Sequence, residues 1–246
     1  TLNIKKRSFV FLCSFVKLLG AIWLGNIGQV IFYMTENAAT SSDGTVGAGG
    51  DGNKYKKGLE TREKILAEAC ELFDNPGYAN SSIRRLIRNI GKSSSVIYSH
   101  FADKEEILFV ITHGTGVRVV NLLTKIMADT PDADACLEKM IVEMLLLMEQ
   151  PRLKMEISIF NNEAHHLSED RRKLVNEMHL EIVHQFEKAV TGVYQKKGRT
   201  AVNEKIAAYN ILAAINWVYV WYRDDGPLTL KEISEDVTRF VFHGLD

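Results

Sequence analysis

The sequence predicts an all-α protein, in which a group of three helices precedes a larger helical domain. In residues 81–101, SSIRRLIRNIGKSSSVIYSHF, apolar side chains recur with the spacing of one buried helix face, at Ile83, Leu86, Ile87 and Ile90. Gly91 separates this helix from a second short one. Downstream of residue 102 only helical patterns follow, without a credible strand pair.

Charge is distributed unevenly along the 246 residues, although the formal net charge is only −1. Residues 54–104 hold ten Lys or Arg against six Asp or Glu, whereas residues 113–246 hold sixteen against twenty. A basic segment beside an acidic one favours phosphate contacts made by one end of the chain. The composition, 46 % hydrophobic and 25 % charged, is that of a soluble protein with a buried core.

The sequence offers little for catalysis or metal binding. The histidine pair 165–166 is adjacent in sequence, and the pair 179–184 misses the i, i+4 spacing of a zinc helix. We find no nucleophile elbow and no phosphate loop, so we expect no enzyme activity, no metal and no cofactor. Three widely spaced cysteines without a CxxC motif disfavour a disulfide scaffold and are typical of a reducing cytoplasm: Cys13, Cys70 and Cys136.

Residues 1–53 differ in composition from the rest. A basic start leads into an apolar run that includes 18 residues without a charge, the short limit for a membrane span. We favour translated upstream sequence with Met34 as the natural start; the alternatives are a membrane tether and a signal peptide. Residues 35–53 are small and polar, which predicts a disordered linker. A basic run follows, as a phosphate-binding arm or as solvated charge: Lys54, Lys56 and Lys57.

The residues on either side of Gly91 describe a helix-turn-helix. One of three polar residues at 80–82 caps the first helix, and Gly91 ends it because a residue without a β-carbon readily takes positive φ. The second helix opens at a serine, 93 or 94, and turns Ile97 and Phe101 inward. In this motif the second helix enters the major groove of DNA, and the first crosses the backbone.

These residues also carry a family resemblance. The order S-S-I-R-x-L, I-G-x-S, V-I-Y-S-H-F and D-K-E-E-I-L, preceded by TREKILAEACELF and GY, closely resembles the DNA-binding domain of the tetracycline-repressor (TetR) family of bacterial regulators. The match runs from Leu59 to Val110 without a gap. Ile87 and Ile90 stand where the family usually has Ala, and Ser95 stands where Gly is common. We therefore expect local repacking and leave the DNA sequence open.

The resemblance implies three parts: a leader and linker over 1–53, a helix-turn-helix domain over 54–104, and an effector-binding and dimerisation domain over 105–246. We expect Ser82, Tyr98 and Lys104 to contact mostly phosphates. The residues with the best chance of contacting bases are Arg84, Ser94, Ser95 and His100, with Ser93 beside them.

Apolar periodicity and capping residues predict the remaining helices, at 60–74, 103–127, 132–149, 152–165, 168–198, 201–223 and 230–244. The helix at 201–223 is apolar over most of its circumference, which predicts burial on all sides. In the family, the last two helices pair with their symmetry mates in a homodimer, and two heads then meet two half-sites about 34 Å apart.

The tail carries a narrower resemblance. Residues 216–223 and 226–229, together with 160–172, resemble the TetR branch that controls fatty-acid and sterol degradation and responds to acyl-CoA thioesters. An acyl chain requires a cavity of apolar side chains with polar groups at one end. Stripes of such side chains are more often plain bundle core than ligand contacts. The resulting candidates for effector binding are Met144, Met148, Phe160, Asn161, His165, Trp217, Tyr222 and Arg223.

Together these observations predict a cytoplasmic, homodimeric, ligand-responsive repressor that binds double-stranded palindromic operator DNA and is released by a small apolar effector, such as an acyl-CoA. Two alternatives stay open. One is a membrane-tethered sensor, based on the apolar leader. The other keeps DNA binding but makes the protein an activator or a multidrug sensor with a generic apolar pocket.

Overall fold

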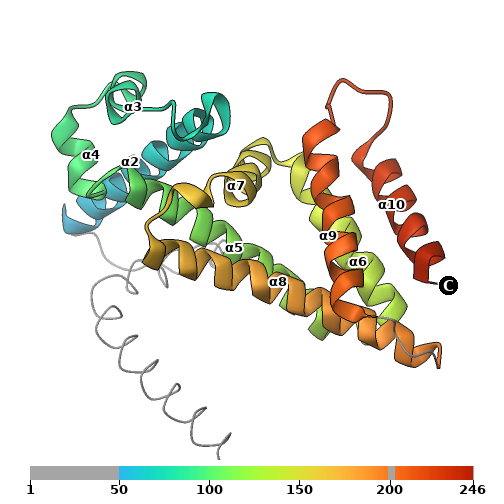
Figure 1. Cartoon of the computed structure of the whole chain (residues 1–246). Helices are drawn as coiled ribbons and strands as arrows, with labels where there is room; N and C mark the ends of the chain where they lie inside the picture. The colour runs from blue at the N-terminus through green and yellow to red at the C-terminus, as the bar shows by residue number, and fades with distance from the viewer. Residues whose placement is uncertain (1–49, 199–202, 246) are drawn as a thin grey trace, which may run out of the picture. The chain divides into compact units, whose positions relative to one another are not determined.

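The computed structural model describes residues 50–198 and 203–245, and every regular element within these ranges is a helix (Figure 1). The all-α prediction is confirmed, whereas the predictions for the leader and most of the linker lie outside the described residues. The α-helices are α2 (Gly50–Leu72), α3 (Ile83–Ile90), α4 (Ser94–His100), α5 (Lys104–Asp129), α6 (Ala133–Leu146), α7 (Pro151–Asn162), α8 (Glu169–Lys196), α9 (Glu204–Trp221) and α10 (Leu230–Leu245).

Helix α2 begins ten residues earlier than predicted, at Gly50 instead of residue 60. The expected linker is therefore helical over its last four residues, and the basic run lies on the first turns of α2. The side chains of Lys56 and Lys57 are exposed there, which is expected both of a phosphate-binding arm and of solvated charge. The helix ends at Leu72, where a turn over Phe73–Gly77 leads towards α3.

Local capping sets the boundaries of the helix-turn-helix as the sequence predicts. The Ser82 hydroxyl accepts the backbone N–H of Arg85 at 3.2 Å and so caps α3. Gly91 ends α3 with φ 66°, and its N–H donates to the last carbonyls of the helix. The Asp103 carboxylate then caps α5 by accepting the N–H of Glu106 at 2.6 Å.

Helices α2 to α4, called the head from here on, share one apolar core with the start of α5. Its fully buried members include Ile65, Leu86, Ile97 and Phe101. Because Ile97 and Phe101 point inward, the remaining sides of α4 are left to solvent. The half-buried Ile87 and Ile90 pack against this core, which is how the head accommodates the two larger side chains.

The C-terminal domain is a helical bundle arranged around α5 and α8, which lie side by side (Figure 1). Helix α7 packs on α5, α6 packs on α8 and α10, and α9 packs on α8. Within the described ranges, α5 is the one helix long and apolar enough to cross a bilayer by length and composition. Its apolar side chains are instead used in the core, where Ile107, Leu108 and Leu123 are fully buried.

Helix α9 is not buried on all sides in this chain, contrary to the prediction from its composition. Ala208, Ile211 and Ile215 are buried, while the opposite face exposes a stripe of large apolar side chains: Ile206, Tyr209, Trp217 and Val220. The prediction was wrong because, among the described residues, α9 packs chiefly on α8 and α6, which cover its buried face. Its apolar composition therefore indicates a second surface, to which the 74 % exposed Phe240 of α10 adds.

Candidate functional site: a nucleic-acid interface and an apolar cavity

The candidate nucleic-acid interface is formed by the outward faces of α3 and α4. The N-cap Ser82, the guanidinium of Arg84 and the three serines at 93–95 are all exposed, and Tyr98 is 55 % exposed. Arg85 and Arg88 lie exposed on α3 as well. This places several hydrogen-bond donors for phosphates and base edges on one short helix pair. The Ser93 and Ser95 hydroxyls lie 2.8 Å apart and form a hydrogen bond with each other.

His100 is half-buried at the end of α4. Burial and the nearby Arg62 guanidinium lower the pKa of its imidazole below the ordinary value. The ring is therefore neutral near pH 7, with one nitrogen that donates and one that accepts a hydrogen bond. Such a ring suits contact with a base edge better than charge pairing with a phosphate.

Lys104 has a structural role that the sequence analysis missed. Its ammonium donates to the carbonyls of Tyr78 and of Ser81, the latter at 2.7 Å, and lies 3.8 Å from the centroid of the Tyr78 ring. Desolvation lowers its pKa, an effect that Glu163 opposes. Lys104 thus holds the loop before α3 against the start of α5, and two of its three donors are used within the protein. Its phosphate contact stays a prediction for the remaining donor.

The bundle contains a cavity of about 300 Å³ at which five helices meet. Its wall is mostly apolar, with Val119 from α5, Met144 from α6, Ile157 and Phe160 from α7, and Leu212 from α9. One side is polar. The Asn161 amide donates to the Asn216 side-chain oxygen at 3.3 Å, and the rings of His179 and Tyr209 also line the cavity. Apolar walls with a few polar groups on one side are typical of sites for small apolar ligands.

Three of the eight predicted effector-binding residues line this cavity, and the other five lie elsewhere. Met144, Phe160 and Asn161 line it, whereas Met148 lines a separate hollow with Tyr219. His165 is exposed beside His166, at the boundary with the head. Three tail residues also lie outside this cavity: Trp217 is 63 % exposed on the outer face of α9, Tyr222 lies under the Lys154 ammonium, and Arg223 pairs with Asp225 on the surface. Their part in effector binding stays a prediction.

Sequence reasoning missed His179, Tyr209 and Asn216 as lining residues. The position of Asn216 in the cavity wall could be inferred only from helix geometry. Asn216 follows the cavity residue Leu212 by four positions and therefore lies on the same face of α9. The sequence pattern singles out His179 only as a possible metal ligand. In the structure its ring stacks on Phe160, with centroids 3.8 Å apart.

The half-buried histidines predict a stability that declines below neutral pH. Burial lowers the pKa of His113 and of His179 below the ordinary value of 6.5. As pH falls through 6.5, the unfolded chain takes up protons that the folded chain does not, so stability decreases, by at most about 1.4 kcal/mol per pH unit for each proton. We expect the thermal midpoint to fall from pH 7 to 5.5, and His179→Gln to reduce that slope. Calorimetry at several pH values checks this, and a slope unchanged in His179→Gln would contradict it.

Two protein-family profiles match this chain. A profile described as "Bacterial regulatory proteins, tetR family" matches residues 65–111, and one described as "Tetracyclin repressor-like, C-terminal domain" matches residues 130–245. Together the two matches span more than half of the chain. The HTH-type transcriptional repressor KstR2 of Mycobacterium tuberculosis (strain ATCC 25618 / H37Rv) is 23 % identical over 193 residues, which cover 75 % of this chain and 92 % of that protein.

Solved structures share the fold. AibR in complex with isovaleryl coenzyme A and operator DNA aligns with a TM-score of 0.68 at 21 % identity, over 74 % of this chain and 98 % of that one. The ketosteroid transcriptional regulator KstR2 of Mycobacterium tuberculosis aligns with a TM-score of 0.68 at 20 % identity, over 74 % and 93 % of the two chains.

Proposed function

Because this chain belongs to the tetracycline-repressor (TetR) family of bacterial regulatory proteins, we propose that it is a repressor that binds operator DNA through α3 and α4 and releases it when a small effector occupies the bundle cavity. The observation that carries the proposal is the open polar face of α4, which Ile97 and Phe101 anchor from below. Such a helix is built to enter a major groove. A regulator of this kind acts in the cytoplasm and is not an enzyme.

The exposed apolar stripe on α9 supports a homodimer. Trp217 and Val220, with Phe240 on α10, present large apolar side chains that a second copy would remove from water. A two-fold dimer through α9 and α10 carries two heads, which then bind two half-sites of a palindromic operator about one DNA turn apart. This is the arrangement expected from the family resemblance of the last two helices.

The cavity favours an acyl-CoA as the effector. Its volume of about 300 Å³ is at the lower end for small-molecule sites, so it suits a short or branched acyl chain, while the nucleotide part of the ligand lies outside. The amides of Asn161 and Asn216 mark the side where the thioester and its neighbouring amides would bind. The structural neighbour AibR was solved with isovaleryl coenzyme A, which makes this compound the first to test.

Fluorescence anisotropy measures binding of the protein to the promoter region of its own gene and so tests the proposal. All titrations use the same salt concentration, because affinity for DNA depends on it. We expect two chains per operator, and isovaleryl-CoA to weaken binding by about 5- to 150-fold, the usual range of coupling between two sites. Isovaleric acid is expected to have no effect. Asn161→Ala should raise the concentration of isovaleryl-CoA needed, whereas Asn162→Ala, next to it but outside the cavity, should not. Operator binding that ignores every acyl-CoA would overturn the effector, and failure to bind would overturn the function.

A further inference from the structure

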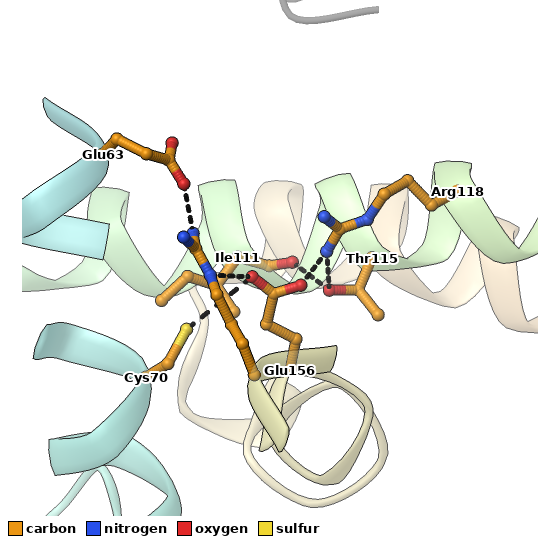
Figure 2. Close-up of polar contacts among 7 residues, drawn as sticks. Glu63, Cys70, Ile111, Thr115, Arg118 and Glu156 are labelled. Carbon is orange, nitrogen blue, oxygen red and sulfur yellow. Dashed lines mark hydrogen bonds and ion pairs between the residues drawn. The ribbon is translucent and has the colours of Figure 1, made fainter. Parts of the chain in front are cut away.

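Four charged side chains form a chain of ion pairs that extends from the head into the bundle (Figure 2). Glu63 of α2 accepts from Arg152 of α7 at 2.5 Å, and the Nε of Arg152 donates to Glu156 one turn further along α7 at 3.0 Å. The other carboxylate oxygen of Glu156 accepts from Arg118 of α5. We call these four residues the Glu156 network. It joins one helix of the head to two helices of the bundle.

Glu156 is the buried centre of this network. Its side chain is only 5 % exposed, and each carboxylate oxygen is paired with a different guanidinium. Oε1 also lies 4.0 Å from the Cys70 thiol of α2, and the Arg118 group that pairs with Oε2 is 3.4 Å from the Thr115 hydroxyl (Figure 2). A buried carboxylate is tolerated only while its charged partners stay in place. The network therefore specifies one position of α7 relative to α5 and α2.

The same residues are direct neighbours of the cavity wall. Val119 follows Arg118 on α5, and Ile157 follows Glu156 on α7, and both line the cavity. Phe160, also in the wall, lies one turn beyond Glu156. A ligand that moves α7 away from α5 must then separate Glu156 from Arg118. Because Arg152 is on α7 as well, the same movement pulls Arg152 away from Glu63 of the head.

We infer that Glu156 is the positioning residue that couples occupancy of the cavity to the orientation of the head. The inference rests on the proposed function and deepens it. With the cavity empty, the network holds α2 against α7 and fixes the head in one orientation. With the cavity occupied, α7 shifts, its ion pairs to α5 and α2 break, and the head is free to take an orientation that does not fit the operator. The effector and the operator thus favour opposite states of the same element, the Glu156 network.

Coupling is measured as the ratio of operator dissociation constants with and without saturating isovaleryl-CoA, using the full chain. We expect Glu156→Gln and Glu63→Gln to lower this ratio by at least about fivefold relative to the unsubstituted protein. Glu63 is 40 % exposed, so Glu63→Gln removes the contact with the head without disturbing a buried charge. Lys196→Gln is the matched control, because it removes ion pairs to Asp132 and Asp134 that join α8 to α6 away from the head, and it should leave the ratio unchanged.

A merely structural role would lower stability in both variants and leave the ratio as it was, and that result would overturn the inference. If the unsubstituted protein ignores isovaleryl-CoA, the proposed effector fails first, and hydrogen exchange of the ligand-free chain then decides. Glu63→Gln, a change in α2, is expected to speed amide exchange in α7, residues 151–162, and to leave α6 unchanged. Exchange in α7 that does not respond to Glu63→Gln would overturn the coupling by itself.

Discussion

Phe101→Ala is expected to destabilise the head by about 3–5 kcal/mol, the usual cost of removing a fully buried aromatic ring. The ring is 2 % exposed directly after α4, shares the head core with Ile97 and Leu86, and lies 4.9 Å below the Arg62 guanidinium. Without it, α4 loses the anchor that holds its polar face outward. Denaturant unfolding of the full chain, followed by circular dichroism, measures the loss, and operator binding should fall with it.

Tyr98→Ala, three residues earlier and within α4, is the matched control for stability. Because Tyr98 is 55 % exposed, its loss should change stability by no more than about 0.5 kcal/mol. We nevertheless expect it to weaken binding to operator and to random DNA alike, since its hydroxyl is predicted to hold a phosphate. Tyr98→Ala with unsubstituted operator affinity would refute that contact, and Phe101→Ala with unchanged stability would refute the anchor. Changing Ser95 should instead alter the preference among sequences.

The features predicted well from the sequence are those set by residues a few positions apart. The Ser82 cap accepts an N–H from three residues further on, and Gly91 acts through its own backbone. The period of apolar residues likewise depends on one helix at a time. The all-helical class and the inward side of α4 follow from such signals, without knowledge of how the helices pack.

The cavity could not be predicted in this way, because its wall depends on where five helices cross. Asn216 lines it and Trp217 does not, although they are consecutive, since one step along a helix turns the side chain by about 100°. Composition alone does not give that phase. The Glu156 network was missed for a related reason, because Arg152 and Glu156 have the i, i+4 spacing of an ordinary surface pair. The sequence does not show that Glu63 of α2 and Arg118 of α5 join this pair and that Glu156 is buried between them.

Two glycines of α5, Gly114 and Gly116, differ in the space available for a side chain. A β-carbon added at Gly116 would lie 2.7 Å from the Met178 Cβ of α8, closer than such atoms approach, and 3.0 Å from the Phe160 ring of α7, which is a tight contact. At Gly114, two positions earlier on the same helix, an added β-carbon meets nothing within 4 Å. Helix propensity favours Ala over Gly by about 0.8–1 kcal/mol at both positions. The space around each glycine therefore decides whether its substitution by Ala raises or lowers the free energy of unfolding.

Gly114→Ala is expected to raise the free energy of unfolding by up to about 1 kcal/mol, and Gly116→Ala to lower it by about 1–3 kcal/mol, because the helices around it must move apart. Gly116→Ala should also weaken the effect of isovaleryl-CoA on operator binding, since Phe160 forms part of the cavity wall. Denaturant unfolding of the two variants under identical conditions provides the measurement. Equal stabilisation by both substitutions would contradict the close packing of α5 against α8 at Gly116 and Met178.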